Sequence, residues 1–160
     1  MEIIDWLNNS ISGEFVLTVL VSMLPVVELR GGIPFGVGMG LSLPLAVAAS
    51  IIGNMLPVPF LILFTRKVFQ WLREKIPALN KSVGRLEERA KKKSNVVKKY
   101  GFWGLMIFVA IPLPGTGAWT GALIAAVMNL RLTRSLPSVF IGVLVAALIV
   151  SLVTLGVISI

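Results

Sequence analysis

The most informative pattern in this chain is a set of long apolar runs that contain no charged residue. Charge-free runs cover residues 31–65, 100–130 and 135–160. A helix that spans a bilayer needs about 20 consecutive apolar residues. The pattern therefore predicts an all-α membrane protein rather than a soluble domain with amphipathic elements.

Charged residues mark where these runs leave the membrane. Twelve of the fifteen Lys and Arg residues lie between Arg66 and Lys99. Such a cluster beside apolar runs is typical of a cytoplasmic segment that contacts anionic lipid, so we expect no nucleic-acid partner. We predict that residues 66–99 form a basic, amphipathic linker of two helices parted by Pro77.

This placement of the linker gives one topology for the remaining segments. The apolar run 44–65 leads into the linker and is predicted to span the membrane from outside to inside. Residues 136–158 follow Arg131 and Arg134 and are predicted to cross outward. Both termini are then expected outside, in a multi-pass protein of a prokaryotic inner (cytoplasmic) membrane.

Two further apolar stretches, residues 15–43 and 100–130, must each enter and leave from the same side. Each has about 30 residues, which is too short for two full spanning helices. Each is interrupted, the first at residues 28–34 and the second at residues 112–121. Non-helical backbone at membrane depth is tolerated where protein or a water-filled cavity surrounds it. We therefore predict two re-entrant helical hairpins.

The two halves of the chain share this plan with opposite orientation. Residues 1–65 and 100–160 each contain a predicted hairpin followed by a spanning helix, within a single membrane domain of residues 1–160. A shift of 89 positions aligns identical residues without a gap: Leu24 with Leu113, Pro25 with Pro114, Gly32 with Gly121, Met39 with Met128, Leu41 with Leu130, Leu43 with Leu132 and Gly53 with Gly142. Inverted repeats with broken helices are a recurring plan of secondary transporters, so we predict two inverted repeats.

Composition narrows the chemistry. The chain has 160 residues, a net charge of +8, no cysteine and no histidine, and its mean hydropathy is +0.93. Disulfides, thiol nucleophiles and Cys- or His-ligated metals are excluded, and we expect no cofactor, no metal site and no enzymatic activity. The acidic start, with Glu2 and Asp5, is unlike a cleavable signal peptide.

Glu28 and Arg30 are the strongest candidate functional residues. They are the only charged residues between Phe15 and Thr65, and a charge at membrane depth costs at least about 2.5–3.5 kcal/mol. Arg30 suits binding of a phosphate or carboxylate, helped by a helix that starts after Gly31 and Gly32. Glu28 is the carboxylate most removed from water and hence the candidate proton carrier. Alternatively, the two charges only pair to hold the hairpin tip.

The second hairpin offers backbone groups in place of charges. Its prolines end the entering helix, its glycines permit a tight turn or an anion-binding nest, and its hydroxyls add donors. The candidate substrate-binding residues there are Pro112, Pro114, Gly115, Thr116, Gly117, Trp119 and Thr120; in the first half they are Arg30, Gly31, Gly32, Pro34 and Asn54. A purely structural turn is an equally good interpretation of the second tip.

The segments Glu28-Leu-Arg-Gly-Gly-Ile-Pro34 and Ile111-Pro-Leu-Pro-Gly-Thr-Gly-Ala-Trp-Thr-Gly121 resemble the small multidrug export protein family. That family is distantly similar to the DedA (SNARE-associated, VTT-domain) superfamily, whose members include transporters implicated in returning undecaprenyl phosphate across the membrane. The resemblance implies two opposed re-entrant hairpins, with Glu28 as the hairpin acid and Arg30 as the basic position. The second tip departs from the DedA pattern, because it has Gly-Thr-Gly-Ala-Trp-Thr where those proteins place arginines.

These observations favour a small transporter or flippase for an anionic amphiphile such as undecaprenyl phosphate, with proton coupling through Glu28. A proton-coupled multidrug exporter with Glu28 as its cation ligand is the first alternative. A non-transporting, membrane-organising protein that works through its basic linker is the second. The expected partners are membrane lipids with anionic headgroups, and the thin bundle predicts a homodimer.

Overall fold

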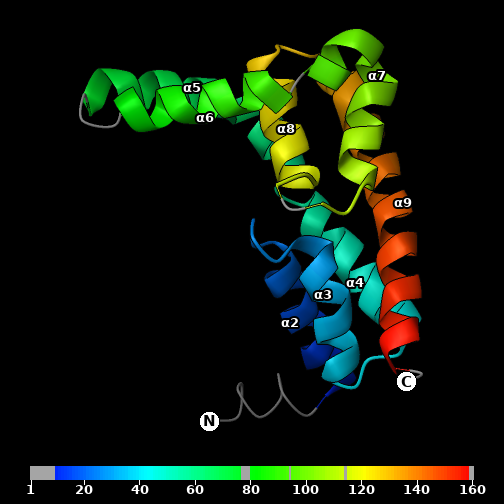
Figure 1. Ribbon diagram of the computed structural model, residues 1–160. Helices are drawn as coiled ribbons and strands as arrows, with labels where there is room; N and C mark the ends of the chain where they lie inside the picture. Colours follow the sequence, from blue (N-terminus) through cyan, green and yellow to red (C-terminus); the bar gives the residue numbers. More distant parts are fainter. Residues whose placement is uncertain (1–9, 77–79, 94, 114, 159–160) are drawn as a thin grey trace. The chain divides into compact units, whose positions relative to one another are not determined.

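The computed structural model describes residues 10–76, 80–93, 95–113 and 115–158, and every regular element in these ranges is an α-helix. The helices are α2 (Ile11–Ser22), α3 (Glu28–Gly38), α4 (Leu43–Met55), α5 (Val58–Lys75), α6 (Asn80–Lys93), α7 (Asn95–Ala110), α8 (Ala118–Val127) and α9 (Leu132–Ile158) (Figure 1). Two compact units result. Unit 1 comprises residues 1–57 and 143–160, and unit 2 comprises residues 58–142.

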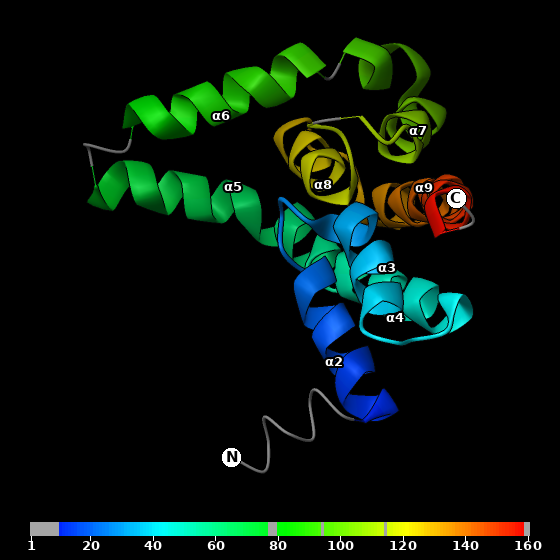
Figure 2. The ribbon, with the colours of Figure 1, turned by 60° about the horizontal axis from the view of Figure 1, so that its bottom comes forward.

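Within unit 1, α2, α3 and α4 lie side by side (Figures 1 and 2). Ser10 caps α2 by accepting a hydrogen bond from the Gly13 N–H at 3.0 Å, and α2 ends just before Pro25, which has no N–H to continue the helix. The residues buried between these helices are mostly small, as is typical of helix contacts in membranes. They are Gly13, Thr18, Ser22, Glu28, Leu29, Gly32, Ile33, Gly36, Ala46, Ala49, Ser50, Gly53 and Asn54.

Glycines allow the helices of unit 1 to approach closely. An ideal Cβ at Gly36 would lie 2.9 Å from Thr18 Oγ1 and 3.0 Å from Ala46 Cβ. One at Gly53 would overlap the carbonyl oxygen of Val19. Side chains larger than hydrogen would therefore push α2, α3 and α4 apart.

Within unit 2, α5 and α6 run side by side as a helical pair (Figure 2), and together they contain most of the basic linker. Two linker helices were predicted, and two helices are present on either side of residues 77–79; Pro77 itself lies outside the described residues. The first helix begins well before Arg66, because the apolar residues from Val58 onward continue into the basic segment without a break.

The other helices of unit 2 pack through glycine and a buried hydroxyl. An ideal Cβ at Gly121 on α8 would lie 2.6 Å from a Val109 methyl group on α7, and one at Gly142 on α9 would lie 2.7 Å from the carbonyl oxygen of Met106. The Ser138 hydroxyl on α9 donates to the Phe102 carbonyl at 2.6 Å. These contacts fix α7 against the start of α9.

Among the described residues, two helical stretches are long and apolar enough to cross a membrane, Leu43–Thr65 and Leu132–Val157. They overlap the two predicted spanning helices, residues 44–65 and 136–158. The first is interrupted at Leu56 and Pro57, between α4 and α5. The prediction that residues 28–34 break the first hairpin is wrong. The non-helical backbone there is residues 23–27, and residues 28–34 lie inside α3.

Candidate functional site

The first break in the chain positions Glu28 at the start of α3. Its N–H donates to the Leu24 carbonyl at 2.9 Å, and its φ is +51°, in the left-handed region that long side chains rarely adopt. Glu28 is only 4% exposed. A strained backbone and a buried carboxylate at the same residue are features that cluster at binding and switch sites.

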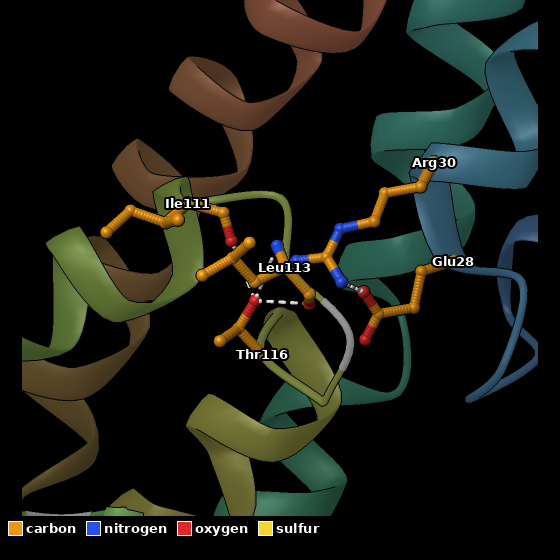
Figure 3. A network of polar contacts seen from close by, with 5 residues as sticks. All are labelled: Glu28, Arg30, Ile111, Leu113 and Thr116. Atoms are coloured by element: carbon orange, nitrogen blue, oxygen red, sulfur yellow. Dashed lines mark hydrogen bonds and ion pairs between the residues drawn. The ribbon is translucent and has the colours of Figure 1, made fainter.

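Arg30 lies one half-turn further along α3 and forms an ion pair with Glu28. Its Nη1 is 3.8 Å from Glu28 Oε2 (Figure 3). This is longer than a charge-assisted hydrogen bond, which measures about 2.7–2.9 Å. The guanidinium has five N–H donors and can bind a planar anionic group while staying beside Glu28.

Arg30 also lines a groove of about 460 Å³ in unit 1, which we call the α3–α9 groove. Its walls come from one face of α3 and from four residues of α9 at helical spacing. The lining residues are Arg30, Pro34, Val37, Gly38, Val150, Val153, Thr154 and Val157. The Thr154 hydroxyl donates to the Val150 carbonyl at 2.8 Å and is therefore already engaged within α9. Arg30 is the one charged residue among the lining residues, and the others are apolar apart from Thr154.

The other candidate residues of the first half have packing positions. Gly31 packs against Val27, and Gly32 lies between the hydroxyls of Ser22 and Ser50. Asn54 on α4 is fully buried and does not line the groove. Of the substrate-binding residues predicted in this half, the structure places Arg30 and Pro34 together in the groove.

The second break, at residues 111–113 and 115–117, overlaps the predicted interruption at 112–121, but residues 118–121 already belong to α8. Thr116 organises it, because its hydroxyl is shared between the carbonyl oxygens of Ile111 and Leu113, both at 2.7 Å, and accepts from the Leu113 N–H at 3.2 Å (Figure 3). These bonds give Thr116 a structural role in the turn.

Two glycines in this turn have left-handed backbone, with φ of +78° at Gly115 and +117° at Gly117. Gly117 precedes α8 without a side-chain cap, and its carbonyl accepts from the Gly121 N–H at 2.8 Å. Pro112, Trp119 and Thr120 are half-buried around this helix start. Pro114 lies outside the described residues.

Unit 2 contains a second cavity that the sequence interpretation missed. It measures about 440 Å³ between α7 and the start of α9. The lining residues are Gly101, Phe102, Leu105, Asn129, Leu130, Arg131, Arg134 and Ser135. The sequence treats Arg131 and Arg134 as topology anchors. The sequence did contain a sign of irregular backbone at this cavity. Gly101 and Asn129 are residue types that tolerate left-handed backbone, and their φ values are +55° and +56°.

Within the described ranges, no group of three or more His, Cys, Asp or Glu residues is positioned to hold a metal ion. A family model described as "Putative small multi-drug export protein" matches residues 28–149. No curated protein and no solved structure matches the chain. The match shows no relation to the DedA superfamily, so that relation stays a prediction.

Proposed function

The chain belongs to the small multi-drug export protein family, and we propose that it is a membrane transporter that moves an anionic amphiphile. The family description agrees with transport and not with an enzyme class. We further propose that the transported molecule is a phosphate-bearing lipid carrier such as undecaprenyl phosphate, and that it binds in the α3–α9 groove of unit 1.

The observation that carries this proposal is the composition of the groove. A guanidinium at Arg30 matches a phosphate, and the valines of α3 and α9 match a hydrocarbon chain. From Arg30 to Gly38 the groove follows eight residues of helix, or about 12 Å. Its volume, about 460 Å³, is in the range of small-molecule sites. It holds a headgroup and the first part of a chain, while the remainder lies in lipid.

Glu28 has a coupling role in this proposal. When Glu28 is ionised it competes with a phosphate for Arg30, and when it is protonated that competition ends. Binding of the anion and protonation of Glu28 are therefore favoured together. Glu28→Gln imitates the protonated state and is expected to retain anion binding while losing the part of the pH dependence that exceeds ionisation of the phosphate itself.

The proposal includes two inverted repeats. Glycines paired by the 89-residue shift make matching contacts in their own units. Gly32 faces Ser50, and Gly121 lies 3.9 Å, measured from an ideal Cβ, from Val139, which is the residue paired with Ser50. Gly53 and Gly142 each approach a backbone carbonyl. These matches support a common plan, as in transporters built from repeats. Inner-membrane location, a cytoplasmic basic linker, outside termini and a homodimer belong to the same proposal.

The decisive experiment measures binding of polyprenyl phosphate to the purified protein in nanodiscs between pH 5 and 8. Saturable binding is expected for the wild type. Arg30→Lys keeps the charge but loses the planar fork, so we expect weaker binding, and Arg30→Ala is expected to abolish it. Equal binding by folded wild type and Arg30→Ala would contradict the proposed site.

A larger side chain in the groove gives an independent test of whether the hydrocarbon chain of the lipid binds there. Gly38 lines the groove, and a Cβ there meets nothing within 4 Å. Gly38→Leu is therefore expected to fold and to weaken lipid binding. Gly156→Leu is the matched control, because Gly156 on α9 is equally open but does not line the groove. Equal loss in both variants would point to a general effect of added bulk.

The alternative cargo is a cationic drug with Glu28 as its ligand, which the family description favours. Glu28 is buried and does not line the groove, whereas Arg30 does, so the geometry favours an anion. Binding of ethidium that depends on Glu28 and survives in Arg30→Ala would reverse this choice. The second alternative is a membrane-organising protein that works through its basic linker. It would be favoured if neither probe binds and if deleting Lys91–Lys93, with both breaks intact, abolishes the biological activity of the protein.

A further inference from the structure

Unit 1 contains buried polar side-chain atoms that have no hydrogen-bond partner in the part of the chain that the structure describes. Ser22, Ser50 and Asn54 are 0% exposed. Ser22 Oγ, Ser50 Oγ and both amide atoms of Asn54 make no hydrogen bond to any described residue. The hydrocarbon of a bilayer offers no partner either. Polar groups in such a position are normally satisfied by ordered water.

Polar residues of unit 1, including Ser22, Ser50 and Asn54, lie in successive layers where α2, α3 and α4 pack together. The first layer contains Glu14, whose carboxylate oxygens are 3.6 and 3.7 Å from an ideal Cβ at Gly40. The second contains Thr18 beside Gly36. The third contains Ser22 and Ser50, which flank Gly32, with Ser50 Oγ 2.8 Å from its ideal Cβ. On α3 and the loop that follows it, the three glycines are spaced four residues apart.

The fourth layer follows from the helix register. Gly36 faces Ala46 and Gly32 faces Ser50, so α3 and α4 run antiparallel. One more turn along each helix reaches Glu28 on α3 and Asn54 on α4. Both are buried. The continued register brings them to the same level.

We infer that Glu14, Thr18, Ser22, Ser50, Asn54 and Glu28 line a water-filled polar track through the three-helix packing of unit 1, which supplies protons to Glu28 from the Glu14 end. Adjacent layers are one helical turn, or about 5–6 Å, apart, a distance that one water molecule bridges. Both hydroxyls of the third layer border Gly32, so a single water between them would serve both. The role of Glu28 as proton carrier rests on the proposed function, whereas the water in the track does not.

The charges of unit 1 agree with a route for protons. Among its described residues, the charged side chains are Glu14 on α2 and Glu28 and Arg30 on α3; α4 and the unit 1 part of α9 contribute none. A cation that enters the track therefore meets a carboxylate at each end. Arg30 lines the α3–α9 groove and is paired with Glu28, so the proton route ends beside the proposed lipid site.

Cysteine labelling tests the track, because the chain has no native cysteine. Ser50→Cys and Ala49→Cys place thiols on neighbouring residues of α4 that are both 0% exposed. In nanodiscs, 2-aminoethyl methanethiosulfonate is expected to modify Ser50→Cys at least about tenfold faster, because a thiol reacts through its thiolate and apolar surroundings suppress ionisation. Asn54→Cys, a reduction in size, provides a second reporter if Ser50→Cys does not fold.

The direction of entry is tested by Thr18→Val in the Ser50→Cys background. The change keeps the shape of the side chain and removes the hydroxyl between Glu14 and Ser22. We expect several-fold slower labelling and only a small drop in melting temperature, because the lost bond from the Thr18 hydroxyl to the Glu14 carbonyl, 2.8 Å, lies within one helix. Unchanged labelling would overturn entry from the Glu14 end, and equal labelling of Ser50→Cys and Ala49→Cys in folded protein would overturn the track. Neither readout requires transport, so the track can fail or stand independently of the proposed cargo.

Discussion

Gly53→Ala tests whether close backbone contact between α2 and α4 determines the stability of unit 1. An ideal Cβ at Gly53 would overlap the Val19 carbonyl oxygen, lie 2.9 Å from the Val19 carbonyl carbon and 3.0 Å from Ser22 Cβ. Two of these three atoms belong to helix backbone, which cannot rotate away as a side chain does. The methyl group is therefore accommodated only if the two helices separate.

The expected cost follows from two opposing terms. Overpacking a tight contact costs about 1–3 kcal/mol, and the backbone obstacle places this variant in the upper part of that range. Alanine is better than glycine in a helix by about 1 kcal/mol. The net loss in the free energy of unfolding is about 1–2 kcal/mol. Gly156→Ala meets nothing within 4 Å and should gain about 0.5–1 kcal/mol.

The assay compares the two variants with the wild type by reversible unfolding of purified protein in mixed detergent and lipid micelles. The wild type is expected to lie between the variants, and Gly53→Ala should be less stable than Gly156→Ala by about 1.5–3 kcal/mol. The same substitution in two membrane helices cancels general effects of the added methyl. Equal stability of the two variants would refute the packing described for α2 and α4.

Three further predictions concern unit 2. Gly142→Ala should destabilise it by a similar amount, about 1–2 kcal/mol in the same assay, because its Cβ would approach the Met106 carbonyl to 2.7 Å. Ser138→Ala removes the 2.6 Å bond to the Phe102 carbonyl and should cost about 1 kcal/mol; a neutral result would contradict that bond. Thr116→Val should loosen the turn before α8, seen as faster amide exchange there, while melting of the remaining chain stays unchanged.

Much of the helical pattern was predictable because membrane helices leave simple signals. Charge-free runs predicted the two apolar stretches Leu43–Thr65 and Leu132–Val157. The proline- and glycine-rich second break and the two helices of the basic linker were also expected. In each case the deciding property is local: length without charge, or a residue that cannot continue a helix.

The position of the first break was not predictable, because glycine has two roles that look alike in a sequence. Gly31 and Gly32 suggest a turn, yet both lie inside α3, where Gly32 allows close packing against Ser22 and Ser50. The turn is instead next to Pro25. Only the tertiary contacts of a glycine distinguish a bend from a close approach.

The candidate site was also predictable only where the signal is local. Glu28 and Arg30 were predicted because isolated charges in an apolar run are costly and therefore informative. The α9 wall of the groove was not, since Val150, Val153 and Val157 look like any lipid-facing valines. A cavity formed by residues more than a hundred positions apart depends on packing that no local pattern contains.

The glycines of α3 connect stability with the proposed mechanism. Gly32 and Gly36 remove side-chain volume on the same helix face where Ser22, Ser50 and Thr18 supply hydroxyls. Small residues give close helix contact, and the hydroxyls make that contact polar. Glu28 lies one turn before Gly32, at the start of α3, and is buried with a left-handed backbone. A larger apolar residue on this face would both separate the helices and exclude water, so structural tightness and access to Glu28 depend on the same positions.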